Sequence, residues 1–268
     1  MSTRQSKTLL VAAIFSVLLS HSAESQVAID SLILNGKKQI KESVDSWNIQ
    51  RLISSRGFFE RLLGDTTYPW LIHYYIAYAD MRIHIYYFSK NDKENAEKFV
   101  DDGIKHLEKS IELKSDFAEG YALLGSLLGN KIALNPMLGM NLGMKSAANI
   151  KKAFDLDPEN PRISLIAGES AYYTPKKFGG GKDRAMEHIE KAIAYFKTYK
   201  PVSPVMPTWG EDEAYTYRGL IQSDFGELDA AKKSFQQALE INPDNLWVKL
   251  NLLPSLEKKI KESDAGEK

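Results

Sequence analysis

Apolar residues recur along much of the chain with the three- and four-residue spacing of an amphipathic helix, and the clearest example spans residues 230–242. Ala231, Phe235 and Ala238 follow one another at steps of four and three, which places them on one helical face. Pro243 cannot continue a helix, and turn-forming Asn and Asp residues surround it. The helix is therefore predicted to end at this point.

A second helix is predicted directly upstream, within residues 213–229, and Gly226 breaks it. Gly219 stands in its middle, where a glycine costs about 1 kcal/mol relative to alanine. We therefore expect Gly219 to mark a close approach of the neighbouring helix, where a side chain would clash. Two antiparallel helices with small residues at their crossing form a helical hairpin.

This hairpin resembles a tetratricopeptide repeat, whose pattern places an aromatic, Gly, Ala, an aromatic, Ala and Pro within 34 residues. Two positions depart from the pattern, because Arg218 stands where the family has leucine and Gln222 where it has an aromatic. The six matching positions are held by Tyr215, Gly219, Ala231, Phe235, Ala238 and Pro243.

The spacing recurs upstream, which favours a repeat protein over a single hairpin. Two further units match well, and looser matches begin near residues 55 and 103. Successive units are further apart than 34 residues, so insertions are expected at residues 130–143, 174–182 and 200–210. The packing positions of the two well-matched units are Gly125, Ala153, Pro158, Gly168, Ala185 and Ala192.

The predicted fold is all-α: a right-handed superhelical solenoid of about five tetratricopeptide-like hairpins, with long insertions and a C-terminal capping helix. One repeat cannot bury its own apolar face, so neighbouring repeats stack and a final helix covers the open end. We expect the repeat domain over residues 26–262, with the cap at 246–261 and a polar tail at 263–268.

The first 25 residues have the pattern of a secretory signal peptide. A basic start is followed by the 13-residue apolar segment 8–20 and by small residues suited to cleavage. An uncleaved anchor is the alternative, although the segment is shorter than the roughly 20 residues that span a membrane. The mature chain is predicted to be soluble in the periplasm or outside the cell, with no transmembrane segment. The absence of cysteine excludes disulfides and a lipid-modified N-terminus.

Charge is balanced, with 35 Lys plus Arg and 35 Asp plus Glu. A net charge of zero gives the whole protein no attraction for nucleic acid, so we expect no nucleic-acid partner. The hydrophobic fraction of 43% is that of an ordinary globular protein and not of a disordered one.

Two stretches resemble catalytic motifs but lack residues that those motifs require, and no enzyme activity, cofactor or metal site is expected. The stretch FGGGKD at 178–183 lacks a phosphate-binding loop's first glycine and its final Ser or Thr, and is interpreted as a flexible turn. GESAY at 168–172 lacks the last glycine of a nucleophile elbow. Asp80 and His84 lie one helical turn apart, and a hydrogen-bonded structural role is favoured over metal binding.

The resemblance implies that the first helix of each hairpin lines a concave groove that binds a partner. Two interpretations of the lining residues stay open: they anchor a ligand, or they pack against insertions that fill the groove. The predicted groove residues are Tyr74, Tyr78, Arg82, Glu119, Asn130, Arg162, Glu169, Tyr172, Tyr173, Glu213 and Asp224.

The function expected from these features is that of a non-enzymatic, exported scaffold that binds a protein or peptide partner in the cell envelope. The alternative is a small-ligand-binding accessory protein of a transport system, which would use an enclosed apolar cavity between groove and insertions. The groove residues do not form the dense basic clamp by which some tetratricopeptide proteins hold a C-terminal carboxylate, so we do not expect that specificity.

Overall fold

The structure is a computed structural model that describes residues 26–266, so the predicted signal peptide lies outside the described residues. A first helix spans residues 26–45 and precedes α2 (Ile49–Glu60). The remaining α-helices are α3 (Pro69–Ser89), α4 (Lys93–Leu113), α5 (Ala118–Leu134), α6 (Gly139–Leu156), α7 (Pro161–Tyr173), α8 (Lys182–Phe196), α9 (Glu211–Asp224), α10 (Leu228–Ile241) and α11 (Leu253–Gly266).

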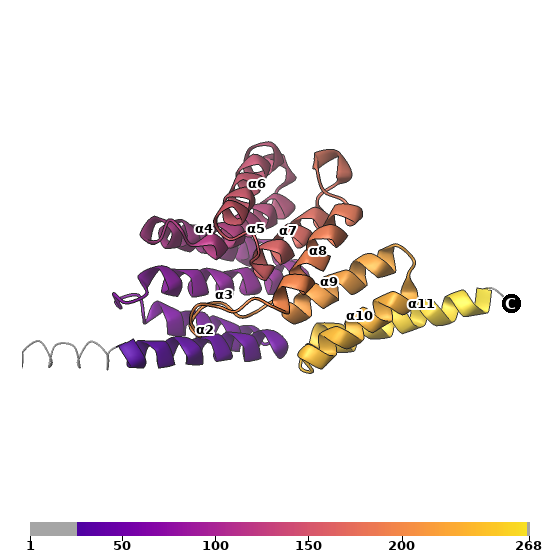
Figure 1. Ribbon diagram of the computed structural model, residues 1–268, viewed down its shortest axis with the longest axis horizontal. Coiled ribbons are helices and arrows are strands. Elements are labelled where there is room, and N and C mark those ends of the chain that lie inside the picture. Colours follow the sequence, from indigo (N-terminus) through magenta and orange to yellow (C-terminus); the bar gives the residue numbers. More distant parts are fainter. Residues whose placement is uncertain (1–25, 267–268) are drawn as a thin grey trace, which may run out of the picture.

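Consecutive helices form antiparallel pairs that stack side by side, as Figure 1 shows. The pairs are α3 with α4, α5 with α6, α7 with α8 and α9 with α10, and the helix over 26–45 packs on α2. The described residues contain helices and no strands. The predicted all-α solenoid of five hairpins is therefore confirmed, and it explains why the hydrophobic pattern follows a helical period.

Small residues lie at the helix crossings, where the sequence places them. A Cβ atom on Gly219 would lie 2.5 Å from the Phe235 ring, so only glycine allows this approach. Gly36 meets Phe59 in the same way within the first hairpin, a pair that the sequence reading overlooked. Gly125, Ala153, Gly168, Ala185, Ala192, Ala231, Phe235 and Ala238 are buried, Tyr215 is half-buried, and Pro158 and Pro243 stand just beyond the ends of α6 and α10.

The glycine-rich insertion before α8 forms a tight turn that contacts α7. A short 3-10 helix, Lys176–Phe178, leads into Gly179, whose φ of +85° is left-handed. A Cβ on Gly180 would lie 2.1 Å from the carbonyl oxygen of Thr174, so the chain passes itself too closely for a side chain. The amide of Gly181 donates to the carbonyl of Ala171 at 2.8 Å and ties the turn to α7.

The C-terminal cap begins at residue 246 and continues further than predicted. Five residues, Val248–Leu252, form a π-helical turn before α11. Pro254 follows, and since proline has no amide hydrogen to donate, a locally widened turn is a common way to accommodate it. α11 runs to Gly266, four residues beyond the predicted end of the repeat domain.

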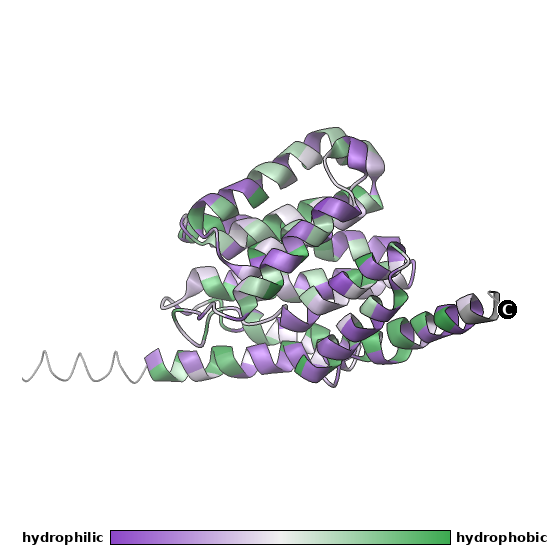
Figure 2. Cartoon of the chain, turned by 45° about the vertical axis from the view of Figure 1, so that its right-hand side comes forward, coloured by the Kyte–Doolittle hydropathy of each residue, from purple (hydrophilic) through white to green (hydrophobic). Residues whose placement is uncertain are grey.

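Apolar and polar residues alternate around each helix, so green and purple mix along every ribbon in Figure 2. The apolar faces meet in three clusters: the largest runs from the first helix to α7, a second joins α7, α8 and α9, and a third is formed by α10, the residues after it and α11. Within residues 26–266 no helix is long and apolar enough to cross a membrane.

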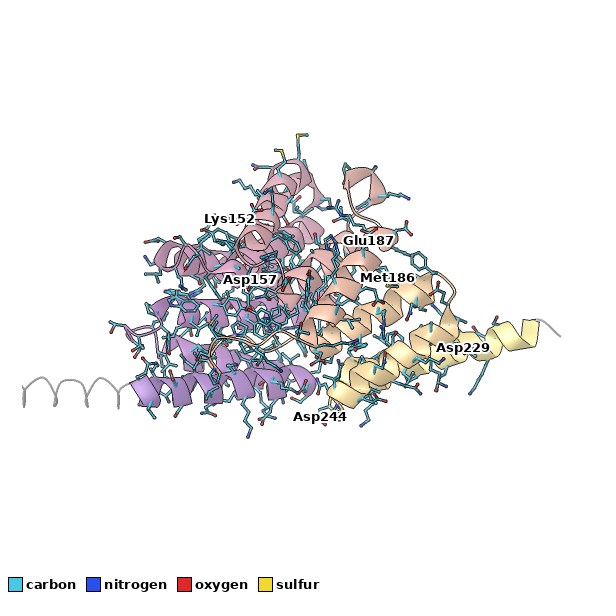
Figure 3. The ribbon with its side chains drawn as sticks, viewed as in Figure 1. Lys152, Asp157, Met186, Glu187, Asp229 and Asp244 are labelled. Atoms are coloured by element: carbon cyan, nitrogen blue, oxygen red, sulfur yellow. The ribbon has the colours of Figure 1, made fainter. Side chains whose placement is uncertain are left out.

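Residues 197–210, between α8 and α9, form the insertion that matters most for the inner surface, and we call them the strap. In Figure 1 the strap is the orange connection that runs from α8 toward α2 and α3 before it returns to α9. Its Tyr199 hydroxyl donates to Asp157, labelled in Figure 3, at 3.1 Å. Val205, at its centre, is buried.

Candidate binding site on the inner face

The strap covers one half of the inner face, which α3, α5, α7 and α9 form. The indole of Trp209 stacks on Tyr78 with ring centroids 4.9 Å apart, and its Nε1 donates to the Tyr74 hydroxyl at 3.0 Å. The Tyr75 hydroxyl donates to the carbonyl of Val205 at 2.6 Å. Lys37, from the first helix, donates to the carbonyl of Met206 at 2.5 Å. The strap thus occupies part of the inner face that the sequence analysis assigned to a partner.

A buried ion pair lies beside the strap. Glu119 Oε1 accepts from Arg162 Nε at 2.9 Å and from its terminal nitrogen at 2.6 Å, and both side chains are only 4% exposed. Asn160 donates to the same oxygen at 2.8 Å. The pKa of the nearby Lys37 is lowered to about 8, mainly by burial and next by the positive charge of Arg162. All three of these hydrogen bonds go to Glu119 Oε1, whereas Glu119 Oε2 is buried without a hydrogen-bond partner among the described residues.

Four of the predicted groove residues are therefore core residues: Tyr74, Tyr78, Glu119 and Arg162 are buried. The strap and its hydrogen bonds cover these side chains, so a ligand that contacts them would have to displace the strap. Of the two interpretations that the sequence left open, packing against an insertion describes these four. We call Tyr74, Tyr78, Glu119, Arg162 and the strap residues above them the closed half of the inner face.

Arg82 and Glu213 mark the boundary of the closed half. The Arg82 guanidinium pairs with Glu213 and donates to the Tyr78 hydroxyl at 3.0 Å. It also lies over the rings of Tyr78, at 5.0 Å, and Trp209, at 5.6 Å. This pair joins α3 to α9 across 131 positions of sequence, so it fixes the start of α9 against the second hairpin.

Beyond this boundary the inner face is open and carries three tyrosines. The ring centroids of Tyr172 and Tyr173 are 4.9 Å apart at 82°, and Tyr217 meets Tyr172 at 6.0 Å and 76°. Tyr173 is 67% exposed, while Tyr172 and Tyr217 are half-buried. We call Glu169, Tyr172, Tyr173 and Tyr217 the tyrosine face. Edge-to-face packing holds these rings in place and leaves one ring open to solvent.

The carboxyl group of Glu169 is the acidic member of the tyrosine face. Burial raises its pKa to about 8, and the nearby negative charge of Glu213 adds to the rise, which Arg82 opposes. Glu169 makes no hydrogen bond among the described residues, although Glu213 is paired with Arg82. It is therefore a carboxyl group whose charge a cationic ligand would stabilise.

Of the two remaining predicted groove residues, Asp224 lies at the edge of the tyrosine face and Asn130 makes no contact with it among the hydrogen bonds of the described residues. Asp224 accepts from the Tyr172 hydroxyl at 2.8 Å and pairs with Lys182 at 3.0 Å. Asn130 is half-buried toward the end of α5. Sequence reasoning missed Tyr217, because it does not stand at a position that lines the groove in the family. The sequence did contain a signal: Tyr217 is two positions from the packing residue Tyr215, so it projects from a different side of α9, and α9 packs against α7.

Asp80 and three of the histidines, His73, His84 and His106, have structural partners, whereas His188 Nδ1 is buried without a hydrogen-bond partner among the described residues. Asp80 pairs with Arg56, and His84 Nδ1 lies 3.0 Å from the carbonyl of Ala96, so the expected hydrogen-bonded roles hold but with separate partners. His73 and His106 approach within 2.8 Å, and burial is the main cause that lowers the pKa of His106 to about 4. No group of three or more metal-ligating side chains occurs within residues 26–266.

One hollow in the structure lies away from the tyrosines. It measures about 480 Å³, is open to solvent, and lies between α4, α5 and α6 with Ile104, Leu128 and Leu142 on its walls. A hollow of about 30 Å³ beside Trp47 is too small for a ligand larger than water. Neither encloses the tyrosine residues that the small-ligand alternative requires.

A family model of known proteins matches the last helical hairpin of the chain. The tetratricopeptide repeat family model matches residues 212–245, which comprise most of α9, all of α10 and the turn after it. The protein contains a tetratricopeptide repeat. The match covers the hairpin in which Gly219 meets Phe235, and it ends two residues after Pro243. It therefore includes all the residues on which the resemblance to the family was based. No curated protein matches the chain in sequence.

Solved structures with this fold extend the likeness over most of the chain. A tetratricopeptide-repeat protein of Thermus thermophilus superimposes with a TM-score of 0.58 at 16% identity, covering 82% of this chain and 98% of its own. The HusA haemophore of Porphyromonas gingivalis superimposes with a TM-score of 0.62 at 22% identity, covering 72% of this chain and 92% of its own. At these identities the likeness establishes a shared helical-repeat fold.

Proposed function

We propose that the protein is an exported, non-enzymatic scaffold that binds a protein or peptide partner at its tyrosine face. The observation that carries the proposal is the packing of Tyr172, Tyr173 and Tyr217 around Glu169 on the part of the inner face that the strap leaves open. Aromatic residues that are both rigid and exposed are the usual anchors of protein interfaces. Scaffolding is also the general role of the tetratricopeptide fold.

Charge indicates what the partner segment carries. The tyrosine face and its rim hold Glu169, Glu213 and Asp224, whereas the cations Arg82 and Lys182 are already paired with two of these acids. A Lys or Arg side chain placed over Tyr173 would gain a cation–π contact and a carboxylate partner in Glu169. The proposed ligand is therefore an exposed protein segment with a basic residue, in the cell envelope.

Export is proposed on the sequence of residues 1–25, whose basic start and short apolar segment are typical of a cleaved signal peptide. After cleavage the chain would lie in the periplasm or outside the cell. The small-ligand alternative requires one cavity lined by Tyr74, Tyr78, Tyr172 and Tyr173. It has less support, because the strap buries the first two residues, whereas Tyr172 and Tyr173 lie on the open tyrosine face.

An affinity capture from native envelope extract tests the proposal, with residues 26–268 as bait. The bait is compared with the Tyr172→Ala/Tyr173→Ala double variant. The control is Phe88→Ala, which removes an exposed aromatic ring at the far end of α3. We expect one protein to be retained by wild type and by Phe88→Ala and lost from the double variant. Equal retention by all three baits would show that the tyrosine face is not the binding site.

A further inference from the structure

Two of the insertions lie on one edge of the molecule. Because the hairpins stack with their first helices side by side, the turns that lead from first to second helix all face the same way. The connection from α5 to α6 and the glycine-rich turn from α7 to α8 therefore lie on a common edge, at the top of Figure 1. We call residues 135–145 and 174–184 the insertion edge.

The insertion edge carries large apolar side chains in full contact with solvent. Met137, Met140 and Met144 are 92%, 86% and 72% exposed, and Phe178 on the second insertion is 71% exposed. The methionines stand at positions i, i+3 and i+7, so they project from one side of the start of α6. Methionine and phenylalanine are normally buried, so a group of four exposed at one edge indicates contact with an apolar phase or partner.

The same edge is basic, although the whole chain has no net charge. Residues 135–145 contain Lys145 and no acid, and residues 174–184 contain four basic residues and one acid. Lys182 pairs with Asp224, and Lys176 lies 3.6 Å from Asp183 with both side chains highly exposed. Lys145 and Lys177 form no ion pair among the described residues. A surplus of positive charge therefore surrounds the exposed apolar side chains.

We propose that the insertion edge binds the surface of an anionic lipid bilayer. Exposed apolar side chains flanked by lysines suit the boundary between acyl chains and headgroups: the methionines and Phe178 enter the apolar layer, and the lysines meet lipid phosphates. Charge complementarity favours an anionic bilayer over a neutral one. The side chains project outward from two separate turns, which fits a flat surface. This inference goes beyond partner binding and does not depend on it.

Vesicle sedimentation tests the inference, with residues 26–268 so that the apolar segment 8–20 does not itself bind lipid. Vesicles of equal phosphatidylglycerol and phosphatidylcholine are compared with vesicles of phosphatidylcholine alone. We expect the protein to sediment with the anionic vesicles, and the bound fraction to fall when 0.5 M NaCl screens the charges. Equal sedimentation with both vesicles, or none with the anionic ones, would overturn the proposal.

Paired variants assign the binding to this edge. Lys176→Glu/Lys177→Glu should weaken the partition into anionic vesicles at least about tenfold, since each basic residue near such a surface contributes about fivefold. Lys258→Glu/Lys261→Glu makes the same change of charge on α11 and should weaken the partition much less. An equal loss in both would show that overall charge, and not this edge, is responsible.

The apolar contribution has its own matched pair. Met137→Ser/Met140→Ser/Phe178→Ser should lower binding, whereas Met137→Leu/Met140→Leu retains the apolar surface and should bind like wild type. All these side chains are exposed, and circular dichroism checks that each variant remains folded. Unchanged binding of the serine variant would contradict insertion into the bilayer.

Discussion

The closed half and the tyrosine face share α7, but the strap covers the first and leaves the second open. The first turns of α5 and α7 place Glu119 and Arg162 beneath the strap, where both are buried. The last turn of α7 places Tyr172 and Tyr173 beyond the strap, where Tyr173 is open to solvent. Position along the helix relative to the strap, and not position within the repeat, decides which residues a partner can reach.

The comparison also shows how an insertion can replace a ligand. Trp209 stacks on Tyr78, and the strap accepts hydrogen bonds from Tyr75 and Lys37 at backbone carbonyls, which is how a groove would hold an extended peptide. The closed half therefore contributes to stability, whereas the tyrosine face is where we propose that a partner binds. Substitutions in the two regions should separate these roles.

The largest effect is expected from breaking the buried ion pair of the closed half. Glu119→Ala leaves the Arg162 guanidinium buried without its carboxylate and removes an acceptor from Asn160. We expect the free energy of unfolding to fall by about 3–5 kcal/mol. Urea denaturation measures the change.

The matched control removes both charges. Glu119→Leu/Arg162→Leu leaves no unpaired ion, so much of the lost stability should return. If the double variant is as unstable as the single one, packing and not charge explains the loss.

A smaller effect is expected from Trp209→Ala, which removes the aromatic contact between the strap and α3. The indole is half-buried and stacks on Tyr78, so the cost should be about 2–3 kcal/mol. Tyr173→Ala, on the tyrosine face, should cost less than about 0.5 kcal/mol because its ring is exposed. Thermal and urea unfolding of the two variants compare the regions directly, and equal costs would contradict the difference between them.

Charge on the tyrosine face should make stability depend on pH. Burial holds the pKa of Glu169 at about 8, above its usual 4.5, so the folded state binds this proton more tightly than the unfolded state. The stability that the protonated carboxyl contributes is full below pH 4.5 and is lost as the pH rises through 8. Glu169→Gln removes this loss.

Urea unfolding at pH 5 and pH 9 measures the effect of Glu169→Gln. The variant should gain stability relative to wild type at pH 9 more than at pH 5. Glu187→Gln on the exposed surface of α8 is the control. A difference from wild type that is the same at both pH values would indicate that Glu169 is charged and solvated, with no burial to disfavour its charge.

The smallest effect is expected at the exposed ion pair between Lys182 and Asp224. Their side chains are 44% and 30% exposed, in contrast to the 4% of Glu119 and Arg162. Asp224→Asn should therefore change the free energy of unfolding by less than about 0.5 kcal/mol. A loss above 2 kcal/mol would mean that the rim of the tyrosine face is as tightly built as the closed half.

The fold could be predicted from sequence because its decisive contacts are local. Gly219 and Phe235 lie 16 positions apart within one hairpin. The spacing of small and aromatic residues along the sequence therefore predicts where the two helices cross. The family match over residues 212–245 coincides with the hairpin that the spacing identified. The other hairpins follow from recurrence of the same spacing.

The closed half could not be predicted because its contacts join distant parts of the chain. Tyr75 and the strap carbonyl that it meets are 130 positions apart, and Lys37 and Met206 are 169 apart. The strap sequence KPVSPVMPTWG has no periodic pattern from which its docking position could be derived. The residues that it buries therefore looked like groove residues until their positions in space were known.

Hydroxyl-radical footprinting of residues 26–268, followed by mass spectrometry, tests the central claim most directly. Tyr172 and Tyr173 should be oxidised readily in the folded protein, while Tyr74, Tyr75 and Tyr78 should be protected by the strap. In Trp209→Ala the protection of Tyr78 should weaken, and the oxidation of Tyr173 should not change. Equal oxidation of both groups of tyrosines in the wild-type protein would show that the strap does not cover the inner face. That result would contradict the division of this face into the closed half and the open tyrosine face.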